Sequence, residues 1–364
     1  MLGAFPTRGC EIQLPEEELS VPTIFDVAKR AGVSKSSVSR VLNGGPVSPK
    51  TRKAVLEAIE ELGYRPSVAA RGLVTKRSQT VGFVLTDVAD PYYSEIIRGV
   101  EAALSEKGYS LILCSARWDN ARELNYIRML AEHRVDGLLV LSSLTTANED
   151  ALQTLSTEME RPVVFLDRSS PGTSFDSVGV DDFTAAAGAV RHLVNLGHAR
   201  IAHVTGPLNY HSGVRRLQGY RHALAQAGIE IDESLIAEGN FTKRGGYEAA
   251  VRLLSLKNRP TAIFAANDIS ALGVWQAARE FGLRIPEDLA LVGFDDIELL
   301  NLADIPLTTV RQPRYDFGYV GTQILLTRIE ESEKPKKRRQ VILPTELIIR
   351  RSCGHHLALR PGAS

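Results

Sequence analysis

The sequence has few cysteines and no long apolar run. Cys10, Cys114 and Cys353 are its only cysteines, and their odd number and wide spacing fit neither a disulfide framework nor a zinc site. No run approaches the ~18 apolar residues of a membrane span, and the first residues lack the pattern of a secretory signal. We therefore expect a cytoplasmic protein without a membrane partner, a metal or a cofactor. Cys114, inside an apolar run, should be a buried thiol.

An excess of charge of one sign is also absent, because 43 Lys and Arg balance 43 Asp and Glu. A zero net charge by itself argues against a nucleic-acid partner. The charge is nevertheless segregated: residues 21–77 contain eleven cations and four acidic residues, a net charge of +7 that leaves −7 for the rest. A compact basic unit on a mildly acidic body predicts a head that binds a polyanion and a body with another task.

Capping signals predict three short helices in the basic segment. Thr23, Ser34 and Ser48 are each placed to cap the start of a helix. Gly32 and Gly63 are placed to end the first and the third helix. The predicted helices cover residues 24–31, 35–42 and 49–62. Together they make a very small helical bundle.

The first two predicted helices have the spacing of a helix-turn-helix unit. Ala28 is small enough to let the second helix approach, Gly32 supplies a tight turn, and Val38 packs the second helix onto the first. The outer face of the second helix carries hydroxyls and two cations, which suit base edges and phosphates in a major groove. These residues are Lys35, Ser36, Ser37, Ser39 and Arg40. A helical hairpin with a merely solvated polar face is the less favoured alternative.

From residue 80 onward, short apolar runs alternate with stretches of helical periodicity. The runs cover residues 80–86, 109–115, 136–142, 161–167, 200–205, 261–266 and 289–294, and the helical stretches include 93–107, 122–133, 183–196, 214–227 and 269–281. Continuous apolar runs indicate strands covered on both faces, as in parallel sheets between helices. This length exceeds one ordinary core, which predicts two doubly wound α/β lobes with a ligand cleft at the carboxyl ends of their strands.

The motifs resemble those of a known family. TIFDVAKRAGVSKSSVSRVLNG followed by VSPKTRKAVLEAIEELGYRPS is similar to the DNA-binding head of the lactose-repressor (LacI/GalR) family of bacterial transcription regulators. Later stretches match in order, among them RVDGLLVL, RRLQGYRHAL, FAANDISALG, LALVGFDD and PLTTVRQP. The resemblance implies an all-α helix-turn-helix head, a hinge helix, and an α/β core similar to periplasmic sugar-binding proteins. It also implies a homodimeric repressor on a pseudo-palindromic operator, whose DNA affinity changes when a small effector fills the cleft.

The expected domains follow from the composition and the resemblance. They are a flexible extension over 1–20, the head over 21–65, the hinge helix and linker over 66–79, the core over 80–353 and a tail over 354–364. Within the core, lobe one is expected over about 80–178 and 310–340, and lobe two over about 179–308 and 341–353. The hinge stretch is Ala-rich but too short for a stable isolated helix, and Gly72 weakens it further.

The resemblance assigns roles to residues of the head and hinge. Lys35, Ser36 and Arg40 fall where members of the family read an operator half-site. Phosphate contacts or helix capping are implied for Thr23, Ser34, Ser37, Ser39 and Asn43. Leu73 falls on the leucine that members push into the minor groove, where an apolar wedge kinks the duplex. The pair Lys35-Ser36 departs from well-known members, so the operator sequence cannot be copied from a relative.

Candidate effector contacts are spread over both predicted lobes. Aromatic residues just after strands or at helix starts can stack on a ligand, and these are Tyr92, Tyr93, Trp118, Phe241 and Phe294. The resemblance adds polar candidates: Asp181, Tyr210, Arg216, Asn267, Asp295 and Gln312. Carboxylates, an amide and a guanidinium beside aromatic faces favour a sugar or related polyol, with a nucleoside or base second. The simpler interpretation of Asp167, Asp268 and Asp296 is that they cap helices.

Two other classes of function are weighed against a DNA-binding regulator. A periplasmic ligand receptor would fit the core alone, but the basic head and the missing signal peptide argue against it. An enzyme would need a catalytic motif, and we find no phosphate-binding glycine loop, Ser-His-Asp context or metal-ligand spacing. His355 and His356 are expected to lie in a polar tail without a role, and a strand is expected over 341–349.

Overall fold

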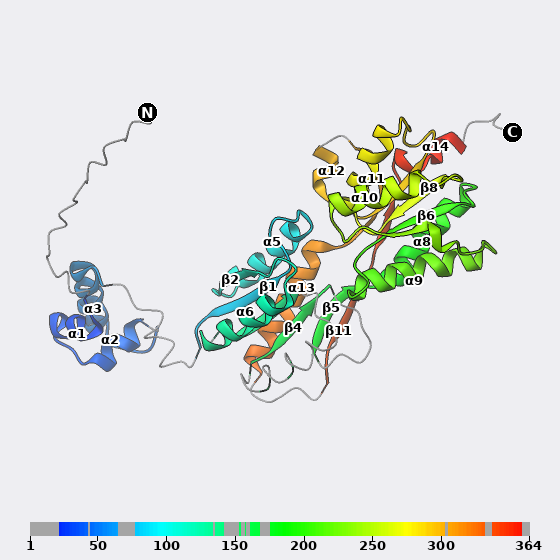
Figure 1. The fold of residues 1–364 in the computed structure, drawn as a ribbon. Coiled ribbons are helices and arrows are strands. Elements are labelled where there is room, and N and C mark those ends of the chain that lie inside the picture. The colour runs from blue at the N-terminus through cyan, green and yellow to red at the C-terminus, as the bar shows by residue number, and fades with distance from the viewer. Residues whose placement is uncertain are drawn as a thin grey trace, which may run out of the picture. The chain divides into compact units, whose positions relative to one another are not determined.

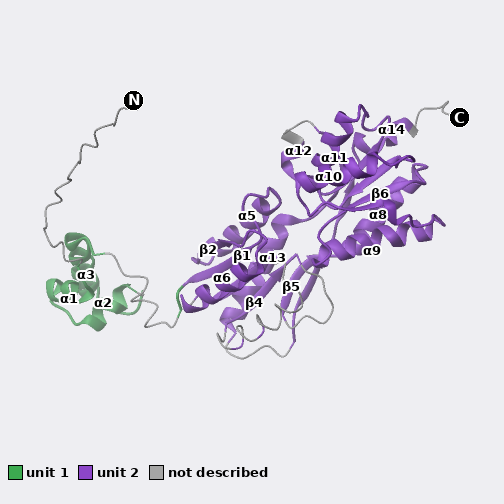
Figure 2. Cartoon of the chain, in the orientation of Figure 1, with its two compact units in different colours: residues 1–78 green, residues 79–364 purple. Residues whose placement is uncertain are grey.

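The structure is a computed structural model, and it describes residues 22–42, 44–64, 77–133, 135–141, 153, 157, 161–167, 175–302, 305–331 and 337–358. The chain divides into two units, residues 1–78 and 79–364, which Figure 2 colours separately. The expected extension over 1–20, nearly all of the expected hinge, and the site candidates Asn43 and Leu73 lie outside the described residues.

The first unit contains the three helices that the capping signals predict. They are α1 (Ile24–Ala31), α2 (Lys35–Leu42) and α3 (Pro49–Leu62). The hydroxyls of Ser34 and Ser48 accept hydrogen bonds from backbone N–H groups in the first turns of α2 and α3. Gly32 and Gly63 end α1 and α3 in the left-handed conformation. One valine from each helix is fully buried between them: Val27, Val38 and Val55.

The second unit begins with a lobe built on a six-stranded parallel sheet (Figure 1). Its strands are β1 (Thr80–Leu85), β2 (Ser110–Ser115), β3 (Gly137–Leu141), β4 (Val163–Leu166), β5 (Asp176–Val180) and β11 (Gln340–Leu343), in the order β11-β5-β4-β3-β1-β2. Its helices are α5 (Tyr92–Ser105), α6 (Asn120–Glu132) and α13 (Arg314–Glu330). Phe83 packs in the core shared with α5 and α13, whereas Val84 packs in the core shared with α6. Cys114 is buried, as expected.

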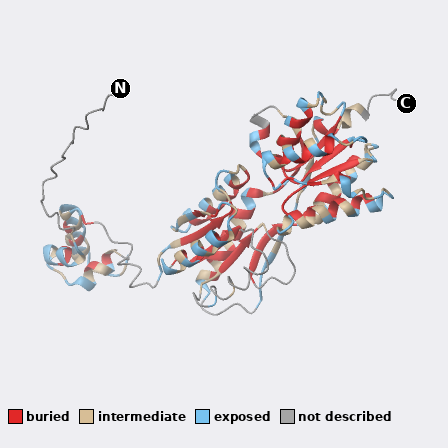
Figure 3. Ribbon diagram, viewed as in Figure 1, coloured by how far each residue is buried: buried red, intermediate tan, exposed pale blue. Residues whose placement is uncertain are grey.

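The other lobe is a second six-stranded sheet with helices on both faces. Its strands are β6 (Ile201–Thr205), β7 (Ile236–Glu238), β8 (Ala262–Ala265), β9 (Ala290–Asp295), β10 (Thr308–Arg311) and the antiparallel β12 (Glu346–Ile348), in the order β12-β10-β9-β8-β6-β7. Its helices are α8 (Asp182–Asn195), α9 (His211–Gln226), α10 (Lys243–Leu254), α11 (Asp268–Glu280), α12 (Glu298–Leu302) and α14 (His355–Ala358). Figure 3 shows both sheets as buried layers between half-exposed helices. The predicted pair of doubly wound lobes is therefore confirmed.

The lobe boundaries near the carboxyl end differ from the expected ones. The sequence predicts one strand over 341–349 in lobe two, but residues 341–343 belong to β11 and pair with β5 in the first sheet. Pro344 has no N–H to donate, so the strand breaks there and continues as β12 in the second sheet. Val310 and Arg311, expected in lobe one, end β10 of lobe two.

The chain crosses between the lobes three times. The crossings lie between β5 and α8, between β10 and α13, and between β11 and β12, and each is at most two residues long. Three short parallel connections allow the lobes to rotate against each other while their cores stay intact, as in hinge-type motions.

Several elements of the body are not predicted from the sequence, of which α13 is the longest. Its buried residues surround it rather than forming one stripe, so its sequence lacks the helical period of a half-exposed helix. The expected polar tail is also wrong at its start, because α14 is half-buried and His355 Nδ1 lies 3.0 Å from the Arg350 carbonyl oxygen. No helix in the described ranges is both long and apolar enough to cross a membrane.

The contact between α5 and α13 gives a test of the fold. A Cβ added to Gly318 would collide with the Ile96 carbonyl oxygen, whereas one added to Gly188 in α8 would meet only an arginine tip at 4.0 Å. Gly318→Ala should therefore lower the free energy of unfolding by about 1–3 kcal/mol. Gly188→Ala, the matched control, should raise it by up to about 1 kcal/mol. Urea denaturation of both variants measures this, and equal effects would contradict the close helix contact.

Candidate functional site

The first candidate site is the outer face of α2 in the head. Lys35, Ser36 and Arg40 are exposed, while Ser37 and Ser39 are half-buried. The Ser34 hydroxyl lies 2.8 Å from the Ser36 hydroxyl and 2.9 Å from the Ser37 hydroxyl. These bonds fix the serine side chains at the amino end of α2. The face thus presents two exposed cations around an ordered group of hydroxyls, a chemistry suited to base edges and phosphates.

Thr23 has a structural role at the start of α1. Its hydroxyl donates to Asp26 Oδ2 at 2.7 Å, and its backbone N–H donates to the same oxygen at 2.8 Å. These hydrogen bonds lower the pKa of Asp26. Thr23 and Ser34 therefore serve as helix caps, one of the two roles expected for them.

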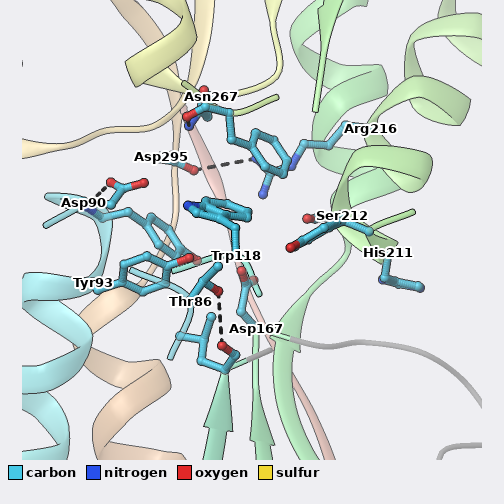
Figure 4. A pocket seen from close by; sticks show the side chains of 14 residues that line it. Thr86, Asp90, Tyr93, Trp118, Asp167, His211, Ser212, Arg216, Asn267 and Asp295 are labelled. Carbon is cyan, nitrogen blue, oxygen red and sulfur yellow. Dashed lines mark hydrogen bonds and ion pairs between the residues drawn. The ribbon is translucent and has the colours of Figure 1, made fainter. Parts of the chain in front are cut away.

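The second candidate site is a pocket between the lobes of the body. Figure 4 shows its lining side chains converging, with the Trp118 ring in their middle. The first lobe contributes Thr86, Asp90, Tyr92, Tyr93, Trp118, Leu141 and Asp167, and the second contributes Tyr210, His211, Ser212, Arg216, Phe241, Asn267 and Asp295. The Trp118 ring centroid lies 5.3 Å from that of Tyr210 and 6.5 Å from that of Phe241. Aromatic rings of the two lobes therefore meet across the pocket.

Trp118 and Phe241 occupy equivalent places in the two lobes. Each follows the edge strand of its sheet, β2 or β7, and directly precedes the N-cap of the next helix, α6 or α10. Both have positive φ, 61° and 55°, as do Arg117 and Asn240 before them. Two successive non-glycine residues in the left-handed region are costly, and such strain concentrates at functional sites. The strained turns aim both rings into the pocket.

Arg216 is the buried cation of the pocket. Its Nε donates to Asp182 Oδ1 at 2.7 Å, and its Nη1 donates to the Ala266 carbonyl at 2.6 Å. Nη1 also lies 3.7 Å from Asp295 Oδ1, and the guanidinium stands 3.7 Å from the centre of the Phe294 ring. Burial lowers the pKa of Arg216, but Asp182 and Asp295 outweigh burial and raise it above its usual range. Arg216 is therefore a permanent positive charge.

Asp295 and Asn267 place polar groups of the second lobe beside Arg216. Gln312 Nε2 donates to Asp295 Oδ1 at 2.8 Å, and Asn267 Nδ2 donates to the Phe241 carbonyl at 3.1 Å. Asn267 also caps α11 by accepting from a backbone N–H. Burial raises the pKa of Asp295, and Arg216 opposes that rise. These contacts fix the orientation of both side chains before any ligand arrives.

Asp167 contributes an under-satisfied carboxylate from the first lobe. Its Oδ1 is buried and has no hydrogen-bond partner within the described part of the chain. Burial and the charge of Asp182 raise the pKa of Asp167 to about 7, against the opposing effect of Arg216. A buried acceptor without a donor is costly. A ligand that carries hydroxyl groups would supply the missing donor.

The structure gathers most of the effector candidates in one place. Tyr92, Tyr93, Trp118, Tyr210, Arg216, Phe241, Asn267 and Asp295 all line the pocket. Gln312 lies behind Asp295 and orients it, and Phe294 lies beneath Arg216. Asp181 does not line the pocket, because its carboxylate caps α8 by accepting from the N–H and hydroxyl of Thr184.

Sequence reasoning missed six lining residues: Thr86, Asp90, Leu141, Asp167, His211 and Ser212. Three of them stand at the carboxyl ends of strands: Thr86 after β1, Leu141 at the end of β3 and Asp167 after β4. Ligands of parallel α/β sheets bind at the carboxyl ends of the strands, so this rule could have identified these three residues.

The interpretation as helix caps is wrong for Asp268 and Asp296. Asp268 accepts from the Thr309 hydroxyl, and Asp296 pairs with Arg311 and Arg350.

The raised pKa of Asp167 predicts a pH-dependent stability. The unfolded chain loses this proton near pH 3.9, whereas the folded chain holds it up to about pH 7, so unfolding free energy falls as pH rises through that window. Asp167→Asn cannot ionise and should lose less stability between pH 5 and pH 8 than the parent. Other groups with shifted pKa values, among them Asp268 and Asp295, titrate in both proteins and contribute the remaining slope. Urea denaturation at both pH values measures the difference, and equal slopes would contradict this assignment.

Comparison with known proteins finds family matches over both the head and the body of the chain. Residues 23–67 match the family described as bacterial regulatory proteins, lacI family, and residues 78–351 match periplasmic binding proteins and sugar binding domain of LacI family. The chain is 39% identical over 332 residues to the HTH-type transcriptional repressor PurR of Haemophilus influenzae (strain PittEE), covering 91% of this chain and 98% of the relative. It is 38% identical over 320 residues to the ribose operon repressor of Escherichia coli (strain K12), covering 88% and 96%.

Solved structures show the same architecture. The lac repressor dimer bound to operator and the anti-inducer ONPF is 31% identical with a TM-score of 0.82, covering 91% of this chain and 99% of that one. A LacI family regulator from Enterococcus faecium with bound ribose is 31% identical with a TM-score of 0.67, covering 75% and 98%.

Proposed function

Since the chain belongs to the LacI family of bacterial regulatory proteins, we propose that its effector is a sugar or a related polyol bound in the interlobe pocket. As a member of this family, the chain is a DNA-binding transcriptional regulator with an effector-binding body and not an enzyme. One observation carries the effector proposal: the Trp118, Tyr210 and Phe241 rings lie beside Asp167, Asp295 and Arg216. Aromatic faces stack on the apolar face of a sugar ring, and carboxylates accept from its hydroxyls.

An unfilled polar atom of the pocket favours a ligand with hydroxyl groups. Asp167 lines the pocket, and its Oδ1 is a buried acceptor without a donor within the described ranges. The ribose-bound regulator of Enterococcus faecium adds support from a related structure. A nucleoside or base is the second candidate, because the same rings can stack on a purine and a relative is named PurR.

The effector test uses Asp295, which Gln312 and Arg216 hold in the pocket. Asp295→Asn keeps the shape but loses a charged acceptor, so the affinity for the effector should fall about 10- to 150-fold. Asp181→Asn is the matched control, because Asp181 lies outside the pocket, and it should bind as the parent does. Calorimetry with ribose, other monosaccharides and nucleosides measures the affinity. A pocket variant that binds like the parent would show that this pocket is not the effector site.

For the head, we propose that α2 enters the major groove of an operator half-site. Lys35, Ser36 and Arg40 would read bases, and Thr23, Ser34, Ser37 and Ser39 would lie close to phosphates. Asn43 and Leu73, which lie outside the described residues, keep their proposed roles at a phosphate and in the minor groove. One small head offers few contacts, so a homodimer on an inverted repeat, acting in the cytoplasm at the nucleoid, completes the proposal.

The effector would act by fixing one relative orientation of the lobes. Its contacts come from both lobes, which are joined by three short crossings, so a bound ligand favours the orientation in which both sets of contacts are made. In a dimer this orientation changes the separation of the two linkers that leave the first lobes. By reciprocity, effector and operator then alter each other's affinity by the same factor.

Base reading is tested with Arg40. Arg40→Ala should cost about 1–3 kcal/mol of operator binding and relax the preference at one position in each half-site. Lys53→Ala removes an equal charge from α3, where Lys53 faces Glu57, and should leave the base preference unchanged. Selection from a random DNA pool measures the preference. Recovery of sites without an inverted repeat would argue against a dimer. An unchanged base preference in the Arg40 variant would mean that Arg40 contacts a phosphate and not a base.

A further inference from the structure

Phe25 is an exposed aromatic residue in the head that has no role in the sites described so far. It is 63% exposed, although phenylalanine is usually buried. It is the second residue of α1, whose start is fixed by the hydrogen bonds between Thr23 and Asp26. α1 turns Val27 and Ala28 into the core of the head, so Phe25 is left on the outside.

The ammonium group of Lys35 lies over the Phe25 ring. Lys35 Nζ lies 4.6 Å from the ring centroid, within the range of a cation–π contact. Within the described part of the head, Lys35 makes no ion pair with a carboxylate. The aromatic face is thus the contact that orders this long side chain at the amino end of α2.

This arrangement brings three kinds of group to one end of α2. They are an apolar ring, a cation held on that ring, and the hydroxyl of Ser36, which is fixed by Ser34. In the major groove, the C5-methyl of thymine is the apolar feature and the guanine edge is the strongest acceptor pair. The 4.6 Å between ring centroid and ammonium is longer than the ~3.4 Å rise of one base pair and shorter than two such rises, so the two groups can face neighbouring base pairs.

We propose that Phe25 is a specificity-determining residue of the operator interface, packing on a thymine methyl group next to the base that Lys35 reads. In the same contact it holds Lys35 in its reading position. The inference rests on the proposed entry of α2 into the major groove. It deepens that proposal by adding α1 to the reading surface and by naming the base feature that α1 recognises.

Leu56 provides a matched control on the same small domain. It is 53% exposed on α3. Leu56→Ala also removes exposed apolar surface from the head, and it does so without touching the Phe25–Lys35 pair. Because both positions are exposed, Phe25→Ala and Leu56→Ala should leave the thermal midpoint of the full chain near that of the parent.

The test combines protein variants with modified DNA. The full-length protein is titrated with its selected operator, in which each thymine of a half-site is replaced in turn by deoxyuridine, which lacks only the methyl group. One such replacement should weaken binding of the parent and of Leu56→Ala by about fourfold per half-site, the factor for one methyl-sized apolar contact. The same replacement should have no effect on Phe25→Ala.

A second variant separates the two parts of the inference. Phe25→Leu keeps an apolar group for the methyl but loses the aromatic face, so the deoxyuridine effect should remain while the preference at the neighbouring base relaxes. If no deoxyuridine position depends on Phe25 while Lys35→Ala and Arg40→Ala still change base preference, this inference is overturned and the proposed function stands. If none of these variants changes preference, the proposed docking of α2 fails as well.

Discussion

The interlobe pocket depends on the buried charge of Arg216. Its guanidinium stacks on Phe294 and donates to Asp182, so its position is set by the second lobe alone. Three carboxylates, those of Asp167, Asp182 and Asp295, surround this single cation. A buried charge without a partner is strongly destabilising. The polar groups of the pocket are therefore kept in place by the need to neutralise Arg216 as much as by any ligand.

The surplus of carboxylates has a chemical consequence. One guanidinium cannot satisfy three buried anions, so Asp167, the one contributed by the opposite lobe, holds its proton up to about pH 7. A hydroxyl-bearing ligand can donate to such a group without bringing a charge into the pocket. A cationic ligand would instead favour the ionised form and would add the cost of burying a second positive charge.

The sequence predicts the head almost completely and the body in outline. Caps such as Ser34 and Ser48 and stops such as Gly32 and Gly63 are local signals, and local signals decide helices this short. The placement of β10 and β11 is not local, because it depends on which distant strand each of them pairs with. The sequence does not predict α13 for a related reason. A helix that is buried on several sides has no polar face, so its sequence lacks the alternation of apolar and polar residues by which a helix is recognised.

The pocket residues also divide into those that local sequence signals predict and those that depend on the fold. Aromatic residues after strands were predictable, and the equivalence of Trp118 and Phe241 follows from the repeated strand–turn–helix unit at the edge of each sheet. Asp181 and Asp182 were not separable by sequence, because adjacent residues at a helix start point in different directions. Only the fold shows that Asp181 caps α8 while Asp182 turns inward to Arg216.

The three crossings also affect how the protein is made. The sixth strand of the first sheet, β11, ends at Leu343, so the first lobe cannot be completed until nearly the whole chain has left the ribosome. The head needs only the residues up to about the end of α3 and can fold long before that. A chain interrupted during synthesis would thus carry a folded head without a finished ligand-responsive body. Each lobe, built from separated pieces of sequence, is also a poor unit for exchange between genes, whereas the head is contiguous and can be exchanged intact.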